Sequence, residues 1–270
     1  MKTKILKILL IISLISMIIL ICFLINLKNI NTKQFSEIIK LKDEAIKSNE
    51  EIKEIKEKMK TKFTYDIEIK QKLDNINLTN INNLMIVAHP DDESIFGGSH
   101  LLNDNKYLVV CITCGTDKKR DNEFISIMNE YGTEYLLLGY LDSVSGIASD
   151  WGGATRYKMY RSLEEIMSYK NWNKVVTHNP EGDYKHDHHR MLSNIITDIS
   201  NSFNEIDRLY YFGKYYDKKD IQLYNFEKID KENLSKKTEL IYKYYSSQKY
   251  ACKLLEHIFP YENWIKAKEW

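Results

Sequence analysis

The chain has 270 residues, of which 43% are hydrophobic and 29% are charged, and its formal net charge is +1. This length accommodates one α/β domain of ordinary size with a smaller element beside it, and the balanced charge argues against a nucleic-acid-binding protein. The cysteines are too few and too scattered to form a disulfide framework. We therefore expect a domain that is stabilised by a hydrophobic core.

The N-terminal region differs from the rest of the chain in composition. Residues 1–7 are basic, and the segment from Ile8 to Leu27 contains no charged residue. A segment of this length spans a bilayer as a helix. We predict an uncleaved, single-pass membrane anchor rather than a signal peptide, because no small-residue cleavage site follows the apolar segment. Lysines flank both ends, so the side of the membrane on which the domain lies stays open.

Residues 31–75 are rich in Lys, Glu and Ile and contain neither Gly nor Pro. This composition predicts a helical stalk. Apolar residues at heptad spacing, among them Ile38 and Leu41, favour a weak coiled coil that would join two copies of the chain into a homodimer. Ser48 and Lys62 fall on the same seam, so a solvated single helix is an equal alternative.

From residue 80 onward, short apolar runs alternate with amphipathic segments, which is typical of a parallel sheet with crossover helices. The predicted fold of residues 80–270 is a Rossmann-like α/β domain with a doubly wound, mostly parallel sheet. Strands are expected at residues 84–88, 107–113, 134–138, 174–177 and 208–212. Helices are expected at residues 94–103, 119–131, 155–169, 189–203 and 231–255.

Ionisable residues gather where the first predicted strand ends. The sequence LMIVAHPDDES continues from this apolar strand into His89 and the consecutive carboxylates of Asp91, Asp92 and Glu93. Open α/β sheets bind their ligands at the carboxyl ends of the strands. A helix cap needs only one carboxylate, so capping alone does not explain the cluster, although it is an alternative role for Asp91.

A second polar cluster, HNPEGDYKHDHHR in residues 178–190, follows the predicted strand at 174–177. In a doubly wound sheet the first strand and the strand that reverses the winding order are neighbours, so both clusters are expected to flank one crevice. A catalytic zinc takes three protein ligands and keeps one open position. The two loops together supply the imidazole and carboxylate ligands that such a site requires, with His89 and Asp92 in one loop and His189 in the other.

The motifs AHPDDES and GDYKHDHH resemble those of the PIG-L or LmbE-like family of zinc-dependent de-N-acetylases, and the resemblance extends over residues 84–248. It implies that His89, Asp92 and His189 bind Zn²⁺ and that Asp91 is the general base. The roles of stabilising the oxyanion and of protonating the leaving amine fall to two further residues, His186 and Tyr184.

The resemblance also implies roles for residues around these. Arg120 and Asp142 correspond to positions that contact the sugar in relatives, and Glu93 is expected to support the metal ligands. Where the family has H-P-D-H, this chain has a histidine, His188, in place of a carboxylate that would support His186. Asp187 is a candidate to take over that role.

These features predict a membrane-anchored hydrolase that removes the acetyl group from an N-acetylglucosamine-containing substrate. Zinc is the expected metal, although a His/Asp/His site also accepts other divalent ions. Because the family includes enzymes of the glycosylphosphatidylinositol pathway, a lipid-linked substrate is favoured. Two alternatives stay open. One is an inactive, membrane-tethered sugar-binding or scaffolding protein of the same fold, which His188 favours, and the other is a metal hydrolase of another amide or ester.

Overall fold

The computed structural model describes the backbone of residues 2–115, 117–144 and 147–270. The side chains are described for the same residues apart from 2–15, 27, 29–31, 34–35, 55–67, 144 and 147. The chain divides into two compact units, residues 1–62 and 63–270. Helix α1 (Lys2–Asp74) makes up the first unit and continues into the second.

The predicted membrane anchor over Ile8–Leu27, and with it the single-pass membrane localisation, is contradicted. In the described part of the chain, no helix contains an apolar segment long enough to cross a bilayer. Side chains of the predicted anchor are described only for residues 16–26, whereas a spanning helix needs about 20 consecutive apolar residues. The side chains of the rest of the predicted segment are not among those described. The predicted fold class is therefore corrected to an α/β domain without the transmembrane helix.

Helix α1 includes residues 31–74 of the predicted stalk, as expected for a segment without Gly or Pro. Of the predicted seam, Ile38 and Leu41 have exposed side chains, with relative accessibilities of 62% and 64%. Pairing of two copies through this seam stays a prediction.

A six-stranded sheet forms the centre of the second unit, in the order β3-β2-β1-β6-β7-β8. Its strands are β1 (Asn83–Val87), β2 (Tyr107–Cys111), β3 (Glu134–Leu137), β6 (Lys174–Thr177), β7 (Leu209–Tyr211) and β8 (Ile265–Lys266). The sheet is mixed, because β8 runs antiparallel to β7 while the other neighbours are parallel. Strand β1 lies between β2 and β6, so the loops after β1 and β6 are neighbours at the carboxyl edge.

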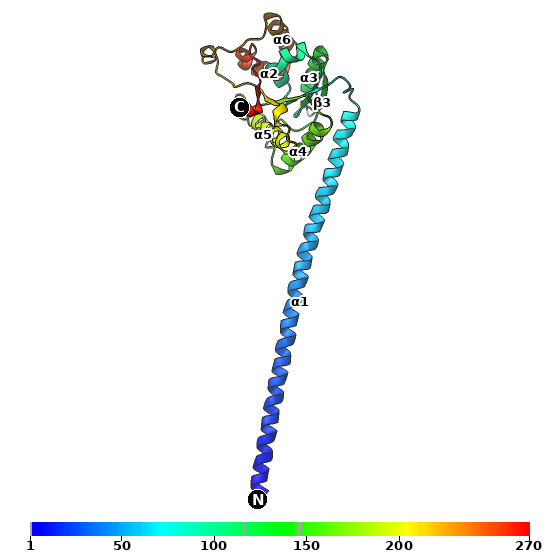
Figure 1. Ribbon diagram of the computed structural model, residues 1–270, viewed down its shortest axis with the longest axis vertical. Helices are drawn as coiled ribbons and strands as arrows, with labels where there is room; N and C mark the ends of the chain where they lie inside the picture. The colour runs from blue at the N-terminus through cyan, green and yellow to red at the C-terminus, as the bar shows by residue number, and fades with distance from the viewer. Residues whose placement is uncertain (1, 116, 145–146) are drawn as a thin grey trace. The chain divides into compact units, whose positions relative to one another are not determined.

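Helices cover both faces of the sheet (Figure 1). On one side lie α2 (Asp92–Asn103), α3 (Lys118–Tyr131), α6 (Lys231–Tyr244) and α7 (Lys249–Leu255), and on the other lie α4 (Gly153–Ser168), α5 (Asp187–Ser202) and the end of α1. Side chains alternate along β1 with a period of two, so Met85 and Val87 enter one core cluster while Leu84 and Ile86 enter the other.

Shorter elements complete the domain. Two of them, β4 (Ser143–Val144) and β5 (Ile147–Ala148), pair in antiparallel fashion outside the main sheet. The 3₁₀ helices are η1 (Ile206–Arg208), η2 (Ile221–Leu223), η3 (Ser246–Gln248), η4 (Glu256–Ile258) and η5 (Ala267–Glu269). Helix η3 divides the predicted helix at 231–255 into α6 and α7.

A buried ion pair ties the C-terminal segment to α2. Lys237 of α6 is fully buried, and its Nζ lies 2.7 Å from Oε1 of Glu262. The same ammonium donates to the carbonyl oxygens of Ile95 at 2.8 Å and Phe259 at 3.0 Å. The Glu262 carboxylate also accepts the backbone N–H of Ser99 at 2.8 Å. Buried charges need such partners, and together these bonds hold α2 against α6 and the C-terminal segment.

Candidate functional site

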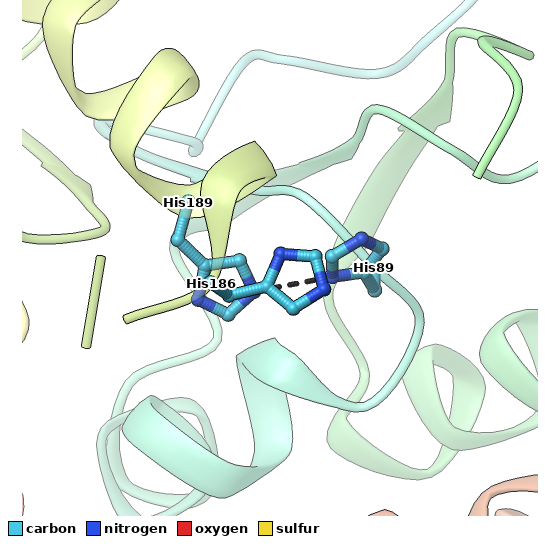
Figure 2. Close-up of side chains that lie close together, drawn as sticks. All are labelled: His89, His186 and His189. Carbon is cyan, nitrogen blue, oxygen red and sulfur yellow. Dashed lines mark hydrogen bonds between the residues drawn. The ribbon is translucent and has the colours of Figure 1, made fainter. Parts of the chain in front are cut away.

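The polar clusters after β1 and β6 meet at the carboxyl edge of the sheet. His89 follows β1, whereas His186 and His189 lie at the start of α5 (Figure 2). Figure 2 shows the three imidazole rings gathered at one point, with the contact between His89 and His189 dashed. Residues 100 positions apart in the sequence are thereby brought within hydrogen-bond distance.

The three predicted metal ligands lie together and are buried. Nδ1 of His89 lies 3.1 Å from Nε2 of His189, and Oδ2 of Asp92 lies 3.3 Å from each of these nitrogens. A tetrahedral zinc with bonds of about 2.0–2.1 Å holds its ligand atoms roughly 3.3 Å apart. The spacing of these three atoms therefore fits zinc without further movement.

Two residues without a predicted role, Asp183 and His178, lie behind His189 and support it. Oδ2 of Asp183 lies 2.8 Å from Nδ1 of His189 and 2.5 Å from Nδ1 of His178. The backbone N–H of Ala88 donates to Nε2 of His178 at 3.0 Å, so that ring carries its proton on Nδ1. Both imidazoles thus donate to Asp183.

This arrangement leaves a lone pair on Nε2 of His189, directed at the proposed metal position. Burial raises the pKa of Asp92, but His189 and His178 outweigh burial and hold the pKa of that carboxyl well below its usual range. The pKa of Asp183 is lowered in the same way by His178 and His189. An ionised carboxylate that faces an imidazole lone pair at 3.3 Å suits a cation between them.

Within the described residues, three overlapping groups of side chains have potential ligand atoms within 4.8 Å of one another. They are His89, His186 and His189; His89, Asp142 and His188; and Asp92, His178 and His189. The side-chain types suit zinc, and iron and cobalt accept the same ligands. The cluster can therefore bind a divalent metal ion, whose identity the ligand types alone do not specify.

Asp91 occupies the N-cap position of α2, yet its side chain makes no capping hydrogen bond. Its φ of 119° is uncommon for a residue with a side chain and costs conformational energy. Burial, followed by the charge of Asp92, raises the pKa of Asp91 well above its usual range. The alternative role of helix cap is therefore not supported, and a carboxylate with a raised pKa beside a metal ligand suits a general base.

Glu93 supports the same loop from within the core. Its Oε2 accepts the backbone N–H of Asp91 at 3.1 Å, and the hydroxyl of Tyr245 donates to its Oε1 at 2.6 Å. Burial raises the pKa of Glu93 to about 7. These bonds hold Asp91 in its strained backbone conformation.

His186 and Tyr184 lie beside the ligands. Nδ1 of His186 accepts the backbone N–H of His188 at 3.2 Å, which leaves Nε2–H as the donor of a neutral ring. Burial and the neighbouring His89 and His189 lower the pKa of His186 to about 3. Burial raises the pKa of Tyr184, whose ring centroid lies 5.2 Å from that of His189. Both residues can donate a hydrogen bond as neutral groups.

Asp142 and Arg120 also reach the site. Oδ1 of Asp142 lies 3.3 Å from Nε2 of His89, and Oδ2 pairs with the guanidinium of Arg120. The two residues therefore lie behind His89.

The position of His188 differs from the expectation. Its Nδ1 lies 3.0 Å from Nε2 of His89, whereas its ring centroid lies 5.3 Å from that of His186. Burial lowers the pKa of His188. Asp187, the suggested replacement for a supporting carboxylate, is exposed and pairs with Arg190. His188 therefore supports a predicted metal ligand rather than His186.

Residues 84–200 match the family described as PIG-L: GlcNAc-PI de-N-acetylase. This part of the chain is therefore a PIG-L family domain, which confirms the family expected from the two motifs. The chain is also 34% identical, over 133 residues, to an uncharacterized protein of Acanthamoeba polyphaga mimivirus. That match covers 43% of this chain and 57% of the relative, so it spans little more than half of the relative's length.

A solved structure, the N,N'-diacetylchitobiose deacetylase from Pyrococcus horikoshii complexed with its inhibitor MPG, is similar at 17% sequence identity with a TM-score of 0.41. The similarity covers 68% of this chain and 75% of that one.

Proposed function

We propose that the protein is a metal-dependent de-N-acetylase that hydrolyses the acetamido group of an N-acetylated amino sugar. Zinc is the proposed metal, with His89, Asp92 and His189 as its ligands. One observation carries the proposal: three buried ligand atoms converge with separations of 3.1–3.3 Å. The match of this segment to a family described by its de-N-acetylase activity supports the same reaction.

When bound, zinc would polarise the amide carbonyl and lower the pKa of water. Asp91 accepts the proton of the attacking water, and a carboxylate pKa that burial and Asp92 raise favours this role. His186 and Tyr184 donate hydrogen bonds to the developing oxyanion. Because the pKa of His186 is lowered to about 3, that ring does not supply a proton as an imidazolium. Protonated Asp91 therefore returns its proton to the leaving amine, and the products are acetate and the free amine.

The family description names an N-acetylglucosaminyl phosphatidylinositol, which supports a lipid-linked substrate. Arg120 and Asp142 are proposed to contact hydroxyl groups of the sugar. Their side chains are 18% and 22% exposed, so part of each is accessible to solvent.

The test combines metal analysis with an acetate-release assay on three substrates: an N-acetylglucosaminyl phosphatidylinositol, a chitobiose and free N-acetylglucosamine. We expect about one zinc per chain, release of acetate that stops when a chelator removes the metal, and highest activity on the lipid. Bound zinc without acetate release from any substrate would favour the inactive sugar-binding protein. Release from a soluble sugar alone would contradict the lipid-linked substrate.

A further inference from the structure

His188 is held rigidly between the loop after β5 and the proposed metal site. Its ring is fully buried and stacks on Trp151 at a centroid distance of 3.9 Å with an interplanar angle of 4°. Nε2 of His188 lies 2.8 Å from the carbonyl oxygen of Ser149, and Nδ1 lies 3.0 Å from Nε2 of His89. The indole N–H of Trp151 donates to the carbonyl oxygen of Leu141 at 2.9 Å, which fixes the stacking partner.

These contacts determine where the protons lie. A carbonyl oxygen can only accept, so Nε2 of His188 must be the protonated nitrogen. The nearest carboxylate, Oδ1 of Asp142, is 3.9 Å from Nδ1 of His188, too far for a hydrogen bond that would stabilise a charged ring. His188 is therefore neutral, and its Nδ1 carries a lone pair. The contact with His89 then requires that Nε2 of His89 be the donor.

We infer that His188 is a positioning residue that holds His89 in its Nε2–H tautomer and so directs the lone pair of Nδ1 at the metal. This inference rests on the metal site of the proposed function. The chain of hydrogen bonds runs from His89 through His188 to the carbonyl oxygen of Ser149, and it involves no charged acceptor. Metal-binding histidines commonly donate their second nitrogen to such a partner, which fixes the tautomer and the ring orientation.

Asp142 is a second acceptor near the same proton. Its Oδ1 lies 3.3 Å from Nε2 of His89, compared with 3.0 Å for Nδ1 of His188. Its other oxygen is paired with Arg120, which draws the carboxylate towards the guanidinium. Comparison of substitutions at His188 and Asp142 therefore separates the two acceptors.

An alternative is that His89, His188 and Asp142 bind a second cation between them. His89 would then have to lose the protons of both ring nitrogens and bridge two ions. The chain of hydrogen bonds through His188 requires only a neutral His188 ring, so it is the arrangement that the contacts favour.

The tautomer is measured in the metal-free protein labelled with ¹⁵N-histidine, from the two-bond couplings between ring nitrogens and ring protons. His89 signals are assigned by their loss in His89→Gln. We expect Nε2 of His89 to be protonated, whether or not Nδ1 also carries a proton. A neutral His89 that carries its proton on Nδ1 overturns the inference, whatever the affinity for zinc.

The second measurement is zinc affinity by chelator competition, with stoichiometry from elemental analysis. His188→Leu removes both nitrogens, whereas His188→Asn restores an acceptor where Nδ1 stood, and Asp142→Leu, which removes the other acceptor, is the matched control. We expect one zinc in wild type and affinity about 10–100-fold lower in His188→Leu, the loss typical of a supporting residue. His188→Asn should bind zinc within a few-fold of wild type, and Asp142→Leu should change the affinity less than His188→Leu does.

Equal loss in His188→Leu and His188→Asn would mean that the ring acts by packing alone and would overturn the inference. Two zinc ions in wild type, with one lost in His188→Leu, would overturn it by making His188 a ligand. If His188→Leu does not fold, the tautomer and the His188→Asn affinity still decide. Absence of zinc binding in folded wild type would contradict the proposed function, whereas the position of the His89 proton in the metal-free protein tests the role of His188 separately.

Discussion

The two histidines proposed to bind the metal are supported from opposite sides by different chemistry. His189 donates to the carboxylate of Asp183, which is shared with His178. His89 is paired with neutral His188, whose own partner is a backbone carbonyl. Hydrogen bonds to an ionised acceptor are roughly twice as strong as those between neutral groups. One ligand is therefore held by a charged acceptor and the other by a chain of neutral hydrogen-bond donors and acceptors.

Removal of His189, the ligand on the charged side, should weaken zinc binding most. His189→Ala deletes a ligand atom and leaves Asp183 with one donor fewer. Zinc affinity should fall by more than the roughly 100-fold upper range for a supporting residue. Asp187→Ala, an exposed change two positions away, is the control and should bind zinc normally. Stoichiometric zinc in purified His189→Ala, measured by elemental analysis, would contradict the ligand assignment.

The next largest effect separates the proton acceptor from the metal ligands. Asp91→Asn keeps the size of the side chain but cannot take a proton, so the rate of acetate release should fall by about 10²–10⁴-fold. Zinc content should stay at the wild-type level, whereas Asp92→Asn should lose zinc. Full activity of Asp91→Asn in the acetate assay would remove this residue from the mechanism.

Replacement of Asp183 with a neutral acceptor tests directly whether charge distinguishes the support of His189 from that of His89. Asp183→Asn keeps one acceptor oxygen but removes the charge that both His178 and His189 contact, so zinc affinity should fall by about 10–100-fold. The matching substitution beside His89, His188→Asn, is expected to change zinc affinity little. Similar affinities for the two variants in chelator competition would mean that charge does not distinguish the two sides.

The smallest expected effect concerns the loop that carries Asp91. Burial raises the pKa of Glu93 from its usual 4.5 to about 7, so the folded state holds this proton at pH values where the unfolded chain has released it. Stability should therefore fall as the pH rises through this window, by about 2 kcal/mol between pH 4.5 and 6.5. In Glu93→Gln, the free energy of unfolding measured with denaturant should fall less over this pH range than in wild type. The same pH dependence in both proteins would contradict the prediction.

The sequence predicts the parts of this site that depend on strand order and motif. His89, Asp92 and His189 were expected to meet because β1 and β6 were expected to be neighbours, and the structure brings them together. Asp183 was missed because it reaches both imidazoles from a left-handed backbone position, with φ of 54°, that no local pattern indicates. His178 follows β6 directly, and that position was the available signal.

Other features depend on contacts that sequence spacing does not encode. The partner of His188 is set by Ser149, in a loop without periodic pattern. Strand β8 has two residues, too few for an alternating signal. The apolar composition of Ile8–Leu27 led to a membrane anchor that the described helices do not support.

The ion pair of Lys237 and Glu262 affects whether the site can form in a shorter fragment of the chain. The family match ends at residue 200, yet both partners of this pair lie beyond it. Through Ile95 and Ser99 they hold α2, the helix whose first residue is Asp92. A fragment that ends at residue 200 would retain every residue of both motifs and lose the anchor of the helix that presents one of them. The matched segment contains the proposed catalytic residues, but the position of α2 depends on residues outside that segment.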